Sequence, residues 1–509
     1  MSDEVIVVGG GVGGLACAID LAARGRRVRL LEKNDDLGGK ARRVRAAGAE
    51  LDGGPTVLTM LWVFEELFDH AGESFRSRLT LDRADRLARH GWSGGTRLDL
   101  FADGQRSADA IGEVFGAREA RAYLKFCDDA RKIFQLSENA FLRSQRLTLP
   151  GVIKEFGARG LAALARLDSH RSMWGSLQKR FREPRLRQLF GRYATYVGSS
   201  PFETPATLNM IAYVESEGVY RARGGMRGLV HALASLAESL GVTIERGVHV
   251  DRIVVKGRQA VGVETAGAFR PAPAVVFNGD VSALGTGLLG EHPARVVKAT
   301  PPESRSLSAV TWAMKARAEG MALIHHNVLF CDDYPAEFEA LLGRQRVPAE
   351  PTVYICAQDR GDESIPGDEP ERLLVLVNAP PTGDRPERWT ERERERCTEA
   401  MTGVLAEAGV TLHSTAATQT TPVEFEKLFP ATGGALYGPR WRGARSVLAR
   451  AGASTAIDGL YVAGGSVHPG PGVPMAALSG RRAAEKVHED LPSTLRSPRG
   501  ATSGTTSTG

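Results

Sequence analysis

Residues 5–25 read VIVVGGGVGGLACAIDLAARG, which is a β-branched run, a glycine-rich turn and an apolar helix in immediate succession. The turn carries Gly9-x-Gly11-x-x-Gly14, the spacing typical of a strand-to-helix junction that binds a dinucleotide pyrophosphate. Gly9 permits the turn, Gly11 lets the backbone approach the phosphates, and Gly14 lets the helix pack closely on the strand. With Gly13 in the same loop, this junction predicts an α/β fold with a Rossmann-like cofactor domain.

An acidic residue follows the second expected strand, residues 28–31, at Glu32. Glu32 lies 18 positions after Gly14, close to the roughly 20 at which a carboxylate binds a ribose 2′-hydroxyl. Its charge would repel a 2′-phosphate and therefore disfavours NADP. The fingerprint alone leaves both NAD and FAD open.

Further glycines and cationic side chains come directly after Glu32. They suit a chain that runs on along the cofactor toward a ribityl and ring system, which favours FAD. The candidate cofactor-binding residues in this stretch are Lys33, Gly39, Lys40, Gly54, Pro55 and Thr56.

A second glycine-rich junction lies near the other end of the chain. Residues 460–463 predict a short strand, Gly464 and Gly465 a turn, and a helix is expected from Met475 onward. Pro474 fits the first helical turn, where its missing N–H costs nothing. A helix N-terminus facing a flavin would stabilise negative charge on the ring, although an ordinary βα unit remains an alternative. The candidate residues here are Gly464, Gly465, Gly472, Val473 and Pro474.

A third stretch returns the chain to the predicted cofactor domain. Residues 224–228 open a helix, a strand is expected at 242–245, a hairpin follows near Val250, and residues 274–277 form a further strand. The candidate residues from this stretch are Val250, Asn278, Gly279 and Asp280.

These segments predict a discontinuous architecture of the GR2 flavoprotein type, with a mixed α+β substrate domain inserted into the cofactor domain. The substrate domain is expected to include a helical, membrane-facing part, with helix-period apolar positions at residues 161–167. The predicted boundaries are 1–75, 216–300 and 426–490 for the cofactor domain, 76–215 for the helical part, 301–425 for the substrate sheet, and 491–509 for a disordered tail rich in Ser, Thr, Gly and Pro.

Composition excludes several classes of protein. A chain of 509 residues exceeds the size of one hydrophobic core, and 42% hydrophobic with 25% charged residues is typical of a globular protein. The net charge of +5 indicates no nucleic-acid partner. Five cysteines without paired spacing predict neither a disulfide framework nor a metal site, and a reducing cytoplasm is expected. We find no secretory signal and no apolar run long enough to span a membrane.

One helical stretch, residues 171–192, is strongly basic and interleaved with apolar residues. Such a surface can lie on anionic lipid headgroups with its apolar face turned inward. A solvated face over a core stripe is the competing interpretation.

The chain resembles the bacterial carotenoid desaturases of the phytoene desaturase type over residues 1–488. The resemblance rests on the N-terminal fingerprint, on DGGPTVLT at 52–59 and on the signature within 460–474, with further matches between them. Within that family, residues 174–202 look most like the branch that desaturates hydroxyneurosporene, a 1-hydroxycarotenoid, at its 3,4-position.

This resemblance implies FAD as hydride acceptor, an acyclic carotenoid as substrate and a new C3–C4 double bond. It also implies peripheral association with the inner or photosynthetic membrane and reoxidation by an acceptor such as a quinone or oxygen. Phytoene desaturation and flavin-dependent carotenoid isomerisation remain alternatives. Amine oxidation and a non-catalytic carotenoid-binding role rank lower.

Two adjacent histidines, His325 and His326, are the catalytic candidates. Imidazole titrates near neutrality, so either could bind the substrate hydroxyl or shuttle a proton. Histidines that are merely satisfied at a strand end are the alternative. His468, inside the C-terminal signature, is expected to shape the loop near the ring.

Overall fold

The structure is a computed structural model, and it describes residues 3–145, 171–361, 369–443, 446 and 450–491. The periodicity expected at 161–167 and the tail from residue 492 onward lie outside the described residues.

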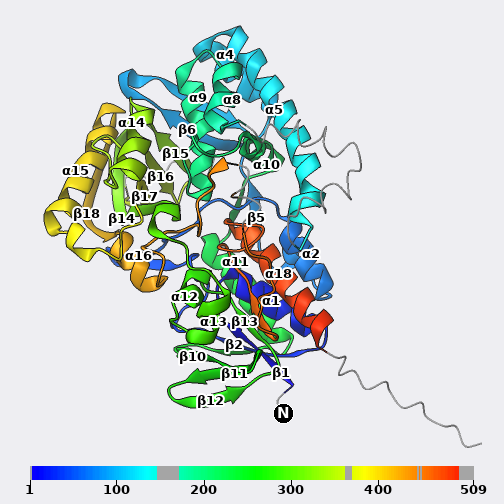
Figure 1. Cartoon of the computed structure of the whole chain (residues 1–509). Coiled ribbons are helices and arrows are strands. Elements are labelled where there is room, and N and C mark those ends of the chain that lie inside the picture. Colours follow the sequence, from blue (N-terminus) through cyan, green and yellow to red (C-terminus); the bar gives the residue numbers. More distant parts are fainter. Residues whose placement is uncertain (1–2, 146–170, 362–368, 444–445, 447–449, 492–509) are drawn as a thin grey trace, which may run out of the picture.

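A parallel five-stranded sheet collects strands from both chain ends and from the middle (Figure 1). Its order is β19-β13-β1-β2-β9. The strands are β1 (Glu4–Val8), β2 (Arg27–Leu31), β9 (Thr243–Glu245), β13 (Val275–Phe277) and β19 (Leu460–Val462). The β-branched run of β1 is buried on both faces, as a central parallel strand requires. The first and last glycine-rich junctions therefore belong to one sheet, as predicted.

Three helices pack together beside this sheet: α1 (Val12–Ala23), α11 (Gly225–Ser239) and α18 (Val473–Asp490). The contact between α1 and α18 is especially close, because a Cβ atom placed on Gly480 would lie 2.0 Å from the carbonyl oxygen of Gly13. Two glycines, one from each end of the chain, thus allow the two helix backbones to touch.

The hairpin expected near Val250 is present and carries a third strand. Its antiparallel order is β10-β11-β12, with β10 (Arg252–Lys256), β11 (Gln259–Thr265) and β12 (Ala268–Pro271), and the short helices α12 (Val281–Gly285) and α13 (Glu291–Val296) follow β13.

A seven-stranded sheet with order β18-β14-β17-β16-β15-β6-β7 forms a second layer. Its strands are β6 (Arg86–Gly91), β7 (Arg97–Phe101), β14 (Ser308–Gly320), β15 (His326–Leu329), β16 (Val353–Ala357), β17 (Glu371–Ala379) and β18 (Val410–Thr420). The helix α15 (Glu391–Glu407) shares a buried hydrophobic cluster with this sheet and lies on its outer side in Figure 1.

Residues 76–215 are mostly helical where the structure describes them, but they also contribute two strands, β6 and β7, that the sequence did not predict. Leu87, Leu98 and Leu100 point to the buried side, while charged residues alternate with them. This is the period of a half-buried strand, and β6 joins the sheet by parallel pairing with β15.

The chain between residues 62 and 217 contains the helices α2 (Trp62–His70), α3 (Phe75–Arg78), α4 (Gly104–Phe115), α5 (Ala117–Ser137), α8 (Met173–Arg180), α9 (Pro184–Gly191), the 3₁₀ turns η3 (Arg192–Val197) and η4 (Ala206–Met210), and α10 (Ile211–Glu217). Of these, α4, α5, α8, α9 and α10 lie above the cofactor sheet in Figure 1. Two small hairpin-like pairs and two short helices complete the fold: β3 (Arg43–Ala46) with β4 (Ala49–Asp52), β5 (Leu81–Arg83) with β8 (Tyr220–Ala222), α14 (Tyr334–Phe338) and α16 (Pro422–Leu428).

The basic stretch 171–192 does not offer its apolar side chains to a membrane. Leu177, Phe181, Leu186 and Phe190 are fully buried in the protein core. This agrees with the competing interpretation, in which the apolar side chains of the segment belong to the protein core and its charged side chains face the solvent. Within the described ranges, no helix combines the length and the apolar character needed to cross a bilayer.

Candidate active site

The N-terminal glycines form a tight cradle between β1 and α1. A Cβ atom on Gly14 would lie 2.0 Å from the Gly9 carbonyl oxygen, and one on Gly13 would lie 2.5 Å from Oδ1 of Asn278. Gly11 is the N-cap of α1 and provides no side-chain cap for the helix. The first backbone N–H groups of α1 are therefore available to an anion, as the sequence predicts.

Glu32 is buried at the carboxyl end of β2, beside this cradle. Its Oε2 accepts a hydrogen bond from the Gly10 backbone N–H at 2.8 Å, and its Oε1 accepts from the Asn34 N–H at 2.9 Å. The carboxylate is thereby fixed next to the glycine loop. Lys33 instead points outward, where its Nζ donates to the Leu428 carbonyl oxygen at 2.9 Å.

The loop after Glu32 folds back onto the first cradle. A Cβ atom on Gly39 would lie 3.2 Å from Cα of Gly11, and one on Gly54 would lie 1.8 Å from the Lys40 carbonyl oxygen. Lys40 donates through Nζ to the Leu436 carbonyl oxygen at 2.6 Å, and burial lowers the pKa of its ammonium group. Pro55 and Thr56 continue this loop toward the second layer.

The residues after β13 close the side of the cradle. The Nδ2 of Asn278 donates to the Gly9 carbonyl oxygen at 3.1 Å, and Gly279 follows it. Asp280 caps α12 by accepting from the Ser282 N–H at 2.9 Å. Val250 is buried just before β10. Two residues earlier, the Val248 N–H donates to the Glu32 carbonyl oxygen, which places this segment beside Glu32.

The C-terminal junction completes the enclosure. A Cβ atom placed on Gly464 would lie 3.1 Å from Oδ1 of Asn278. The N–H of Gly464 donates to Oγ of Ser479 at 3.2 Å. The carbonyl oxygen of Gly465 accepts a hydrogen bond from Nη1 of Arg450 at 3.1 Å. Gly472 caps α18 without a side-chain hydrogen bond, and Val473 and Pro474 form its first turn.

This arrangement fits a dinucleotide such as FAD. Two helix N-termini without side-chain caps, those of α1 and α18, belong to the same module. In addition, Oδ1 of Asn278 and Oδ2 of Asp280 are buried without a hydrogen-bond partner, as expected of atoms that a bound group would satisfy.

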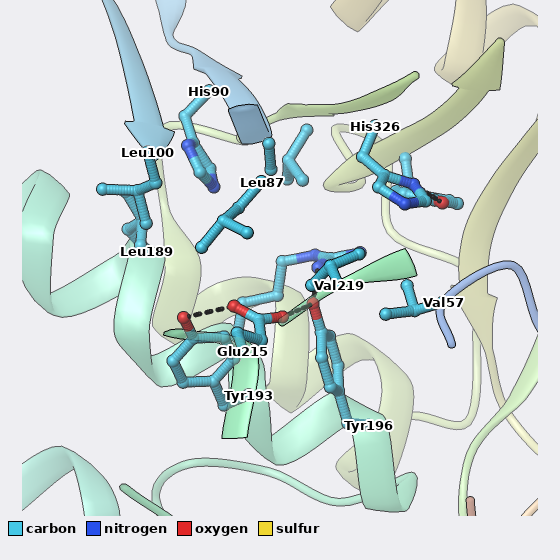
Figure 2. A pocket seen from close by; sticks show the side chains of 14 residues that line it. Val57, Leu87, His90, Leu100, Leu189, Tyr193, Tyr196, Glu215, Val219 and His326 are labelled. Atoms are coloured by element: carbon cyan, nitrogen blue, oxygen red, sulfur yellow. Dashed lines mark hydrogen bonds between the residues drawn. The ribbon is translucent and has the colours of Figure 1, made fainter. Parts of the chain in front are cut away.

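A pocket is lined in part by Val57, the residue after Thr56 (Figure 2). Aliphatic side chains form about half of its wall, and polar side chains, among them His90, His326 and Glu215, lie on several sides of it. Its lining residues are Val57, Leu87, Ala88, His90, Leu100, Leu189, Arg192, Tyr193, Tyr196, Glu215, Val219, His326, Val328 and Tyr354.

Of the two catalytic candidates, His326 lines this pocket and His325 does not. The Nδ1 of His326 lies 2.7 Å from the hydroxyl of Tyr354, which in turn lies 2.6 Å from Oγ1 of Thr56. The Nε2 of His326 is buried without a hydrogen-bond partner. A short polar chain therefore joins His326 to the predicted cofactor loop.

Burial lowers the pKa of His326 well below its ordinary value, with the nearby His325 adding to the effect. His325 itself is held by the Arg360 carbonyl oxygen, 3.0 Å from its Nδ1. Ligand atoms of His325, His326 and Cys356 lie within 4.8 Å of one another. Burial raises the pKa of the Cys356 thiol to about 12, so the free thiol is protonated.

His468 is buried near the C-terminal junction, with its Nε2 3.1 Å from the Ser144 carbonyl oxygen. Burial lowers its pKa to about 4, so its imidazole is neutral. This placement is consistent with a structural part in the loop.

The sequence did not identify Glu215 as a functional residue. Its carboxylate is buried in the pocket wall and accepts hydrogen bonds from Tyr193 and Tyr196, and burial raises its pKa. The available signal was weak: two tyrosines three residues apart, and a glutamate that follows an apolar residue on a short helix.

Comparisons with known proteins agree with this geometry. A profile described as flavin containing amine oxidoreductase matches residues 12–488. A hydroxyneurosporene desaturase of Rubrivivax gelatinosus is 48% identical, covering 99% of this chain and 97% of the relative. A second, from Cereibacter sphaeroides, is 41% identical with coverage of 97% and 99%. A 4,4′-diaponeurosporene oxygenase of Staphylococcus aureus is 29% identical with coverage of 96% and 98%.

Solved structures share the fold at much lower identity. A putrescine oxidase matches with a TM-score of 0.59 and 15% identity, covering 96% of this chain and 99% of that chain. An oxidoreductase from Methanosarcina mazei matches with a TM-score of 0.58 and 16% identity, covering 96% and 100%. The chain belongs to the flavin-containing amine oxidoreductase family and is an FAD-dependent oxidoreductase.

Proposed function

We propose that this protein is a carotenoid desaturase that introduces a C3–C4 double bond into acyclic 1-hydroxycarotenoids during carotenoid biosynthesis. The observation that carries the proposal is the pocket of aliphatic and polar residues beside the loop of Gly54, Pro55 and Thr56. The full-length relatives named hydroxyneurosporene desaturase support the choice of substrate.

The proposed reaction removes a hydride from one methylene carbon and a proton from its neighbour, and the electron pair of the second C–H bond forms the new π bond. FAD, when bound, supplies a hydride acceptor, and a quinone or oxygen would then take up the electrons. The protein must keep water away from the cationic carbon chain that hydride loss leaves. Val57, Leu87 and Val219 in the pocket wall suit that task.

His326 is our candidate for accepting the proton. A neutral imidazole with an unpartnered Nε2 can act as a base, and the hydrogen bond to Tyr354 orients the ring. His325 touches the His326 ring edge-on, with ring centroids 4.5 Å apart, and is proposed to position it.

Product analysis tests the proposal against its alternatives. We expect the purified enzyme to convert 1-hydroxyneurosporene to a product with two fewer hydrogen atoms and one more conjugated double bond. Conversion of phytoene instead would indicate a phytoene desaturase, and a product of unchanged mass would indicate an isomerase. Absence of flavin reduction by any carotenoid under anaerobic conditions would indicate a binding protein.

An amine substrate is less well supported. The amine oxidases that share the fold are about 15% identical, whereas the relatives above 40% identity carry a carotenoid name. Flavin reduction by putrescine, with none by 1-hydroxyneurosporene, would reverse this ranking.

We further propose peripheral contact with the inner or photosynthetic membrane, because an acyclic carotenoid dissolves in lipid rather than in water. The basic side chains of the stretch 171–192 could attract anionic headgroups, although Arg180 is paired with Asp129 and Arg185 with Glu183. Lys179 and Arg182 are exposed. Reversing the charge of these two residues is expected to reduce sedimentation with anionic liposomes, and unchanged sedimentation would assign the contact to another surface.

A further inference from the structure

A group of hydrogen-bonded polar side chains forms one part of the pocket wall. Glu215, on α10, accepts a hydrogen bond from the Tyr193 hydroxyl at 2.7 Å through Oε2 and from the Tyr196 hydroxyl at 2.9 Å through Oε1. Figure 2 shows the carboxylate between the two tyrosines. Glu215 and Tyr193 are buried, so both hydroxyl hydrogens are committed to the carboxylate rather than to solvent.

Arg192, at the start of η3, adds a cationic donor to the same wall. Its guanidinium group stacks 5.5 Å from the ring centre of Tyr196 and 5.3 Å from that of Tyr354. Its Nη1 lies 3.4 Å from the Tyr196 hydroxyl oxygen. Among the described residues, the contact with Tyr196 is the one hydrogen bond found for the Arg192 guanidinium, so its other N–H donors remain for a ligand in the pocket.

The hydrogen-bond acceptor and donor in this part of the pocket wall indicate which class of ligand it can bind. A carboxylate has about four lone-pair positions, of which the two tyrosines use two, and a guanidinium offers only donors. One acceptor and one donor side by side match an alcohol, which donates once and accepts once. An anionic ligand would be repelled by Glu215, and a bare hydrocarbon end would leave the remaining lone pairs of Glu215 and the remaining donors of Arg192 without a partner.

We propose that Glu215, Tyr196 and Arg192 bind the terminal hydroxyl of the carotenoid substrate, with the hydroxyl donating to Glu215 and accepting from Arg192. This inference rests on the proposed function and deepens it, because it states how the enzyme distinguishes a hydroxylated carotenoid from its hydrocarbon precursor.

The expected discrimination is large. A site built to hydrogen-bond a substrate hydroxyl can reject the analogue that lacks it by as much as about 10⁴-fold, since the lone pairs and donors that the hydroxyl would use are then left without a partner. The aliphatic side chains Leu87, Leu100 and Val219 around the polar group would contact the hydrocarbon end whether or not it is hydroxylated. The polar group should therefore carry the selectivity.

The test compares Glu215→Gln with the wild-type enzyme. We expect the KM for 1-hydroxyneurosporene to rise at least about tenfold, while the inhibition constant of neurosporene changes less than about twofold. A purely structural role for Glu215 would weaken both carotenoids alike. Glu217→Gln serves as the matched control, because Glu217 lies on the same helix and is exposed.

Tyr196→Phe provides a second variant should Glu215→Gln fail to fold, and it is expected to raise the same KM with the flavin spectrum unchanged. An unaltered ratio of the two constants in a flavin-loaded variant would overturn the hydroxyl-binding inference. Failure of the wild-type enzyme to desaturate 1-hydroxyneurosporene would instead overturn the proposed function, so the two failures are distinguishable.

Discussion

Gly480→Ala is expected to separate the two ends of the cofactor domain and to abolish FAD retention. The added methyl group would lie 2.0 Å from the Gly13 carbonyl oxygen and 3.0 Å from the Cys17 nitrogen, and these are backbone atoms that cannot rotate away. Overpacking a tight contact costs about 1–3 kcal/mol and occasionally more. Here α1 and α18 must move apart, so we expect a loss of at least about 3 kcal/mol in the free energy of unfolding.

The flavin-to-protein absorbance ratio and a denaturant unfolding curve measure this outcome. Gly403→Ala is the matched control, because Gly403 also lies in a helix, α15, but has open space around its Cβ position. That substitution should be neutral or stabilising by up to about 1 kcal/mol, since alanine has the higher helix propensity. A Gly480→Ala protein with normal flavin content and stability would contradict the close approach of the two helices.

Replacing His325 and His326 together with alanine is expected to lower kcat by about 10²–10⁴-fold, the usual contribution of a positioned acid or base. FAD content should stay unchanged, because neither ring is part of the glycine cradle. Rapid-reaction measurement of flavin reduction by 1-hydroxyneurosporene reports the affected step. The control is His231→Ala, which removes an exposed imidazole from α11.

The pH dependence gives an independent check on His326. Because burial lowers its pKa, more acid than usual is needed to protonate the ring, and it stays a neutral base as the pH falls through its ordinary value near 6.5. We therefore expect kcat to show no decline between pH 8 and 6 that depends on His326. Unchanged turnover in the double variant would remove both histidines from the mechanism.

The cofactor domain was predictable because its signals are local. The glycine spacing from Gly9 to Gly14 specifies strand, turn and helix within a few residues, and Glu32 ends the next strand. By contrast, the β6–β7 hairpin was missed, because the alternation of charged and apolar residues extends over only six residues in β6 and five in β7. Arg89 and Asp99 form an ion pair across the two strands at 2.7 Å. The sequence alone does not show that these two charges face each other, because they meet only when the strands pair.

Of the candidate site too, one part was predictable from the sequence and another part was not. His326 was identified from an unusual histidine pair, but its hydroxyl partner Tyr354 belongs to the neighbouring strand and has no sequence signal. Glu215 lies 19 residues from one hydrogen-bond partner and 22 from the other, and both partners belong to η3. Pocket walls of this kind follow from packing, which single-sequence patterns do not report.

The strand order β19-β13-β1-β2-β9 also has a consequence for biogenesis. The central strand β1 is translated some tens of seconds before its neighbour β13 at about 5–20 residues per second, and β19 follows later still. During that interval β1 has β2 but not β13 beside it, so one edge of this β-branched strand stays unpaired and nascent-chain chaperones should protect it. We expect flavin to be retained only after β19 has joined the sheet, and chains that stop before β19 should be cleared by proteolysis instead of accumulating as partial holoenzyme.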